Sequence, residues 1–113
     1  MKKICVVISS RANYSSIKST MLAIQNNDRL KLQVVCFAFG RVVNLIKEDG
    51  FYVDAEVNVL IEGENPLTMA KSTGLALMQL PETFSNLEPD VIITVGDRYE
   101  TMATALSASY MNI

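Results

Sequence analysis

Short runs of apolar residues alternate along this chain with longer stretches in which apolar residues recur every three or four positions. The first run, residues 4–9, is almost entirely apolar, which is typical of a strand buried on both faces. Residues 14–26 follow, and Ile17, Met21 and Ile24 have the spacing of one helix face. The same alternation predicts further strands over 30–39, 51–57 and 91–95, and further helices over 42–48, from 65 onward and over 99–110.

The ends of two predicted helices carry recognisable signals. Gly50 suits the left-handed cap that follows a helix over 42–48. Asn65 is a suitable N-cap for the long helix, and Pro66 a suitable first residue. Pro81 should kink or divide this helix, because proline lacks the N–H group that the interior of a helix requires.

Four strands that alternate with four helices predict an α/β fold, with a Rossmann-like parallel sheet and flanking helices. In the doubly wound strand order 3-2-1-4, the connections leave the first and fourth strands in opposite directions. The expected binding site is then the crevice outside the carboxyl ends of these two strands. The loops at that crevice are 9–14 and 96–100. The fourth strand would have an unpaired edge, so we expect residues 1–113 either to be a fragment of a larger domain or to recruit the missing part from another chain.

Composition excludes several kinds of protein. The chain has 113 residues, half of them apolar, and a net charge of -2 without a basic run, which argues against nucleic-acid and membrane-surface binding. It contains no histidine, so a Ser-His-Asp triad and the usual zinc sites are excluded within these residues. Cys5 and Cys36 lie in apolar runs and are expected to be buried thiols. No metal or cofactor is expected, no transmembrane segment is predicted, and the cytoplasm is the expected compartment.

The first loop reads Ser-Ser-Arg-Ala-Asn-Tyr-Ser at positions 9–15. A helix begins here, so backbone N–H groups face the crevice. Arg11 can donate paired hydrogen bonds to a phosphate or carboxylate, Ala12 lets a ligand approach the backbone, and Ser15 and Ser16 add hydroxyl donors. A surface arginine beside serine caps explains the same residues without a ligand. Neither a P-loop nor a Gly-x-Gly-x-x-Gly pattern is present, which disfavours a dinucleotide.

The second loop reads Val-Gly-Asp-Arg-Tyr-Glu at positions 95–100. Gly96 permits a tight turn. Asp97 has two interpretations: an N-cap of the last helix, or an exposed carboxylate that acts as acid or base. Arg98 beside it can bind an anionic substrate. Glu100 follows Asp97 by three residues, which predicts a pairing similar to a capping box.

These two loops resemble sequence elements of the hydrolysing UDP-N-acetylglucosamine 2-epimerases. Residues 10–14 are similar to the family's Arg-Ala-Glu/Asp-Tyr element, and residues 96–100 to its Gly-Asp-Arg-Tyr/Phe-Glu/Asp element. Other segments fall in the family's order: Glu-Asp-Gly-Phe at 48–51, Gly-Leu-Ala-Leu at 74–77, Leu-Pro at 80–81 and Leu-Glu-Pro-Asp at 87–90. The family has two Rossmann-like domains with the active site between them, as in the GT-B glycosyltransferases. The resemblance implies that residues 1–113 are a partial N-terminal domain, without its remainder and without the C-terminal domain.

The resemblance also implies a reaction and a set of site residues. Family members eliminate UDP from UDP-N-acetylglucosamine and hydrate the resulting glycal to N-acetylmannosamine, in sialic-acid-type sugar biosynthesis. By this resemblance Arg11, Ala12, Ser15 and Arg98 line the UDP site, and Asp97 is a catalytic carboxylate. A UDP-sugar substrate and a homo-oligomeric full-length protein are implied as well, and the isolated 113-residue chain is expected to be inactive.

Two departures from the family keep other functions open. The loop after the second strand, Phe-Ala-Phe-Gly-Arg-Val at 37–42, is short and lacks the family's histidine and Tyr-Gly pair. The family's next segment, a strand that leads into a Gly-Gly-Glu loop, is missing. Hydrolysis of UDP-2,4-diacetamido-2,4,6-trideoxyglucose in legionaminic acid synthesis is one alternative. A non-catalytic nucleotide-binding or assembly module is another.

Overall fold

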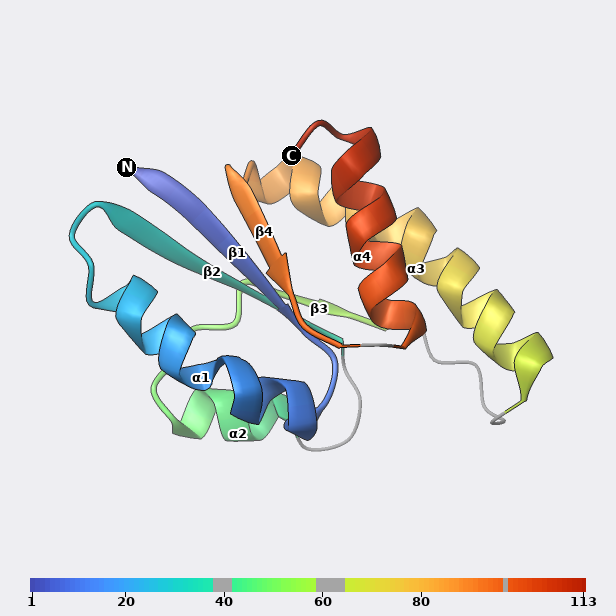
Figure 1. Ribbon diagram of the computed structural model, residues 1–113, viewed down its shortest axis with the longest axis horizontal. Coiled ribbons are helices and arrows are strands. Elements are labelled where there is room, and N and C mark those ends of the chain that lie inside the picture. Colours follow the sequence, from blue (N-terminus) through green and yellow to red (C-terminus); the bar gives the residue numbers. More distant parts are fainter. Residues whose placement is uncertain (38–41, 59–64, 97) are drawn as a thin grey trace.

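The computed structural model describes residues 1–37, 42–58, 65–96 and 98–113. Strands and helices alternate from one end of the chain to the other (Figure 1). They are β1 Lys2–Ile8, α1 Arg11–Gln25, β2 Leu30–Phe37, α2 Val42–Glu48, β3 Ala55–Val57, α3 Pro66–Leu87, β4 Val91–Thr94 and α4 Tyr99–Tyr110.

The four strands form one parallel sheet in the order β3-β2-β1-β4, which confirms the predicted fold class and strand order. At the carboxyl end of β1, Ile8 lies opposite Cys36 of β2, and Val7 lies opposite Thr94 of β4. The strand order reverses at β1, so the connections from β1 and β4 run to opposite faces of the sheet. Helices α1 and α2 cover one face, and α3 and α4 cover the other (Figure 1).

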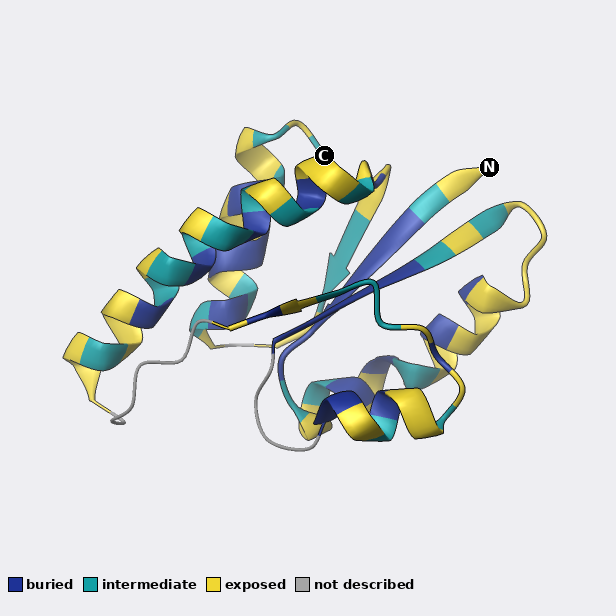
Figure 2. Cartoon of the chain, turned by 180° about the vertical axis from the view of Figure 1, so that it is seen from behind, coloured by how far each residue is buried: buried dark blue, intermediate teal, exposed yellow. Residues whose placement is uncertain are grey.

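Alternation of side chains along β1 divides the core into two layers. Ile4, Val6 and Ile8 pack against α1 and α2 on one face. Cys5 and Val7 pack against α3 and α4 on the other. The inner parts of β1 and β2 are buried on both faces, whereas their amino-terminal ends are exposed (Figure 2). The continuous apolar run in the sequence therefore reflects a strand at the centre of a covered sheet.

Helix α3 is continuous from Pro66 to Leu87, so Pro81 does not divide it, which was one of the two effects expected of this proline. Its buried residues are spaced by four along the helix and lie on both sides of the proline: Ser72, Ala76, Leu80 and Phe84. Packing of this face against the sheet and α4 compensates for the single missing N–H donor. The start of the helix is as predicted, with Asn65 as N-cap and Pro66 first.

Other element boundaries differ from the predictions. Helix α1 begins at Arg11, three residues before the expected start, because Ser10 caps it. Strand β3 is confined to Ala55–Val57, although residues 51–57 were expected to be extended. Strand β2 is described as far as Phe37, and residues 38–39, which were expected to continue it, lie outside the described residues. None of the helices that the structure describes is long and apolar enough to cross a membrane.

Candidate nucleotide site

The first turn of α1 is built by a reciprocal cap between Ser10 and Asn13. The Asn13 N–H donates to Ser10 Oγ at 3.2 Å, and the Ser10 N–H donates to Asn13 Oδ1 at 3.1 Å. Asn13 also binds Ser9, the residue before the cap, since its Nδ2 donates to Ser9 Oγ at 2.7 Å. These hydrogen bonds fix the turn from β1 into α1. The N–H groups of Arg11 and Ala12 lie at the start of the helix, where an α-helix offers no intrahelical acceptor.

The turn from β4 into α4 depends on glycine. Gly96 has φ +148°, a conformation that residues with side chains rarely adopt. A Cβ atom at this position would lie 2.7 Å from Thr101 Oγ1. The sequence therefore needs glycine here for both conformation and space.

The start of α4 corrects one sequence-based expectation. The N-cap residue is Arg98, not Asp97, and its side chain makes no capping hydrogen bond. Glu100 is consequently the second helical residue instead of the third, and its predicted pairing with Asp97 involves a residue outside the described part of the chain. Asp97 itself lies outside the described residues.

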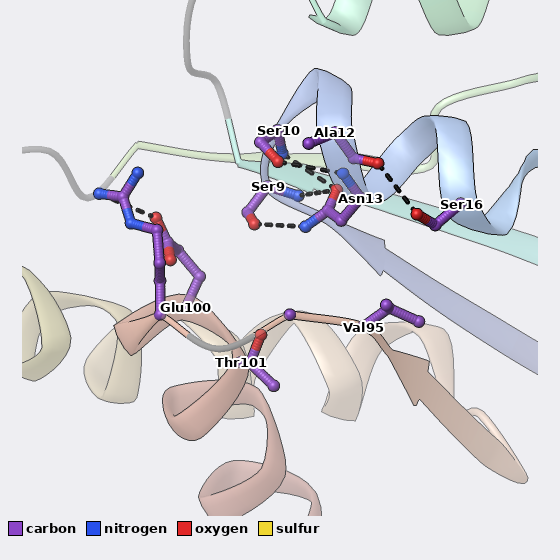
Figure 3. A pocket seen from close by; sticks show the side chains of 10 residues that line it. Ser9, Ser10, Ala12, Asn13, Ser16, Val95, Glu100 and Thr101 are labelled. Carbon is purple, nitrogen blue, oxygen red and sulfur yellow. Dashed lines mark hydrogen bonds and ion pairs between the residues drawn. The ribbon is translucent and has the colours of Figure 1, made fainter.

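A cavity of about 440 Å³ opens between these two turns, outside the carboxyl ends of β1 and β4. Figure 3 shows Ser9, Ser10 and Asn13 on one side of it, and Glu100 and Thr101 on the other. Its lining is Ser9, Ser10, Ala12, Asn13, Ser16, Val95, Gly96, Arg98, Glu100 and Thr101. This is the crevice that the strand order predicts, and the first turns of two helices border it.

Among the described residues that line the cavity, Arg98 and Glu100 carry charge. The Arg98 side chain is 60% exposed, whereas that of Glu100 is 3% exposed. One guanidinium nitrogen of Arg98 lies 3.7 Å from Glu100 Oε1, and the guanidinium carbon lies 5.6 Å from the centroid of the Tyr99 ring. Burial raises the pKa of the Tyr99 phenol above its usual value, and the Glu100 charge adds to this rise, which Arg98 opposes. The site thus places an exposed cation over a buried carboxylate.

The predicted site residues separate into three groups. Ala12 and Arg98 line the cavity. Arg11 lies instead in a neighbouring depression with Asn44, Leu45 and Glu48. Ser15 is exposed on α1 and does not line the cavity.

Two lining residues were not predicted as site residues, although the sequence spacing of one of them carries a signal. Asn13 lies three residues after Ser10, and this spacing is the mark of a reciprocal helix cap. Thr101 had no such signal, because its position against Gly96 depends on how the β4–α4 turn folds.

The two cysteines are free and buried, as expected. Burial raises the pKa of both Cys5 and Cys36 to about 12. Both thiols therefore stay protonated near neutral pH and are poor nucleophiles.

Comparison with known proteins identifies the family. A family profile described as UDP-N-acetylglucosamine 2-epimerase matches residues 22–113. A GDP/UDP-N,N'-diacetylbacillosamine 2-epimerase (hydrolyzing) of Campylobacter jejuni is 28% identical over 118 aligned positions, which cover 99% of this chain and 30% of that protein. The polysialic acid biosynthesis protein P7 of Escherichia coli is 28% identical over 119 positions, covering 100% of this chain and 30% of that protein.

Solved structures agree with this result at the level of the fold. The UDP-GlcNAc 2-epimerase from Neisseria meningitidis, bound to UDP-GlcNAc, superposes with a TM-score of 0.84 at 21% identity. The match covers 98% of this chain and 30% of that one. The chain thus spans about 30% of the length of the relatives it matches. Because the family profile covers most of its residues, the chain belongs to the UDP-N-acetylglucosamine 2-epimerase family.

Proposed function

We propose that the cavity between β1 and β4 binds the UDP portion of a nucleotide sugar, in an enzyme that hydrolyses the substrate while it inverts C2. The observation that carries this proposal is the cavity at the point where the strand order reverses, with Arg98 at its mouth and helix N-termini on both sides. The related structure from Neisseria meningitidis contains UDP-GlcNAc, which supports a ligand of this class.

Each predicted site residue has a role in this proposal. Arg98 stabilises the negative charge that develops on the departing diphosphate, and Ala12 leaves the backbone open to the ligand. Arg11 is exposed at the start of α1, and it contacts the diphosphate when its side chain turns from its own depression toward the cavity. Ser15, on the same helix, is kept as a proposed hydroxyl donor to the ligand, although it does not line the cavity in the free protein. Asp97 follows Gly96 directly and acts as the carboxylate that transfers a proton during UDP elimination or glycal hydration.

The complete gene product that contains residues 1–113 provides the test. Incubated with UDP-N-acetylglucosamine, it should release UDP and N-acetylmannosamine. Asp97→Asn should reduce kcat by a factor of about 10² or more, because general acid–base groups contribute at least that much. Asp28→Asn, which makes the same change on an exposed loop, should not. Normal turnover by Asp97→Asn would remove the catalytic assignment.

A second substrate is favoured by the name of the relative from Campylobacter jejuni, which refers to N,N'-diacetylbacillosamine. The corresponding reaction hydrolyses UDP-2,4-diacetamido-2,4,6-trideoxyglucose, in the route to legionaminic-type acids. Both substrates carry the same UDP group, so the cavity serves either. Parallel assays with the two sugars, compared by kcat/KM, assign the substrate.

The size of the relatives supports a larger protein around this chain. We propose that residues 1–113 are part of the N-terminal Rossmann-like domain of a cytoplasmic, homo-oligomeric enzyme with two domains, and that turnover requires the rest of the protein. A non-catalytic nucleotide-binding or assembly module is the alternative. UDP binding by the complete gene product without turnover of either sugar would establish that alternative.

A further inference from the structure

Glu100 is a buried carboxylate at the wall of a site proposed to bind an anion. Its side chain is 3% exposed and lines the cavity. Within the described part of the chain, Glu100 Oε2 meets no hydrogen-bond donor in good geometry. The Tyr99 hydroxyl lies close enough to Glu100 for this carboxylate to raise the pKa of the phenol. Burial of a carboxylate with so few partners opposes folding, and its charge opposes an anionic ligand.

The surroundings of Arg98 point to a use for this carboxylate. Arg98 carries a long, mostly exposed side chain, which would lose rotamer freedom on binding a ligand. Two successive residues of α4 restrict it in the free protein. Glu100 Oε1 lies 3.7 Å from the guanidinium, and the Tyr99 ring lies under it at 5.6 Å. Charge-assisted hydrogen bonds are typically about 2.8 Å long. At 3.7 Å, Glu100 therefore attracts the guanidinium without taking up one of its N–H donors in a hydrogen bond.

We propose that Glu100 is a positioning residue, whose buried carboxylate holds the Arg98 guanidinium at the mouth of the cavity to receive the diphosphate of a nucleoside-diphosphate ligand. This inference rests on the proposed function, since it assumes that the cavity binds UDP. Glu100 does not touch the ligand in this arrangement. It acts through Arg98 by reducing the number of rotamers that the arginine samples before binding.

Glu100→Gln tests the inference, because charge repulsion and positioning predict opposite results. The glutamine keeps the shape of the side chain and removes its negative charge. If Glu100 only repelled the ligand, the variant would bind UDP more tightly. If Glu100 positions Arg98, the variant should bind UDP roughly tenfold more weakly, because a misdirected arginine loses its contact with the diphosphate. Calorimetric titration of the complete gene product with UDP measures the difference.

Three further variants isolate the pathway through Arg98. In an Arg98→Ala background, Glu100→Gln should cause no further loss of UDP affinity, because the group it positions is gone. Glu82→Gln makes the same change of charge on the exposed side of α3 and should leave UDP affinity unchanged. Glu100→Asp keeps the charge but withdraws the carboxylate by one methylene, and should also weaken binding. The aspartate variant takes the place of Glu100→Gln if thermal unfolding shows that the glutamine variant is not folded.

Each outcome bears on a different claim. Weaker binding that disappears in the Arg98→Ala background supports the inference. Unchanged or tighter binding by folded Glu100→Gln overturns it and leaves the proposed UDP site intact. An equal loss of affinity with and without Arg98 also overturns it, because Glu100 would then act by another route. If the wild-type gene product does not bind UDP, the proposed function and the inference both fall.

Discussion

At the scale of single residues, Gly96 determines the conformation of the β4–α4 turn, which borders the cavity. Its φ of +148° and the 2.7 Å approach of a Cβ atom to Thr101 Oγ1 both oppose a side chain. We expect Gly96→Ala to destabilise the protein by about 1–3 kcal/mol and to weaken UDP binding, because the β4–α4 turn must move. Thermal unfolding and UDP titration measure the two effects.

Gly74 is the matched control for this substitution. It lies inside α3, and a Cβ atom there would meet nothing within 4 Å. Gly74→Ala should therefore leave the protein as stable as before or stabilise it by up to about 1 kcal/mol, because alanine favours a helix over glycine. Equal stability of the Gly96→Ala and Gly74→Ala variants would show that the β4–α4 turn tolerates a side chain.

At the scale of elements, Tyr14 connects α1 to the residues that follow α2. Its hydroxyl donates to Asp49 Oδ2 at 2.5 Å, and Lys18 Nζ lies 3.1 Å from the same oxygen. The Tyr14 ring is 2% exposed and meets Phe51 edge-on at 6.4 Å. Tyr14→Phe keeps the ring and removes the hydrogen bond, and should cost about 1–2 kcal/mol of stability near neutral pH. Tyr52→Phe, at a side chain that is 79% exposed, should cost nothing.

The effect of Tyr14→Phe should depend on pH. The hydrogen bond from Tyr14 and the ion pair with Lys18 lower the pKa of Asp49 below its usual value near 4. A carboxyl with a lowered pKa contributes stability that is complete above the pKa of the unfolded chain and is lost as pH falls through the folded-state value. Denaturant titrations at neutral pH and below about pH 4 should show the wild type losing its advantage over Tyr14→Phe in acid. A constant difference would mean that Asp49 does not accept this bond.

The sequence predicted those elements whose signals are local. Helix α2, helix α4 and the cap at Asn65 are as expected, because each depends on a few adjacent residues. The start of α1 was missed because its first turn is polar, so the apolar periodicity begins only at Tyr14. Pro81 does not divide α3, because packing on both sides of it holds the helix together. Whether a helix continues through a proline depends on its tertiary contacts, and these contacts cannot be read from local helix propensity.

The candidate site was predictable in position but not in all its members. The alternation of strands and helices placed the crevice at β1 and β4, where the cavity lies. Ala12 and Arg98 line this cavity, whereas Arg11 borders a separate depression. Side-chain direction within one helical turn separates Arg11 from Ala12, and residue types do not encode this direction. The burial of Glu100 was not predicted for the same reason, because residue type does not give the direction of a side chain.

At the scale of the whole molecule, the sheet leaves β4 at one edge of its order, with β1 as its neighbour on the other side. Val91 is 44% exposed on this strand and Val95 just beyond it is 39% exposed. Open edges with exposed apolar residues pair with other strands. Isolated residues 1–113 should therefore self-associate at micromolar to millimolar concentrations, and Val91→Lys should increase the monomer fraction. Sedimentation velocity measures both quantities.

Met78→Lys is the control, because it places the same charge on an exposed methionine of α3, away from the sheet edge. If Met78→Lys suppresses association as strongly as Val91→Lys, general surface hydrophobicity drives the association and the β4 edge does not.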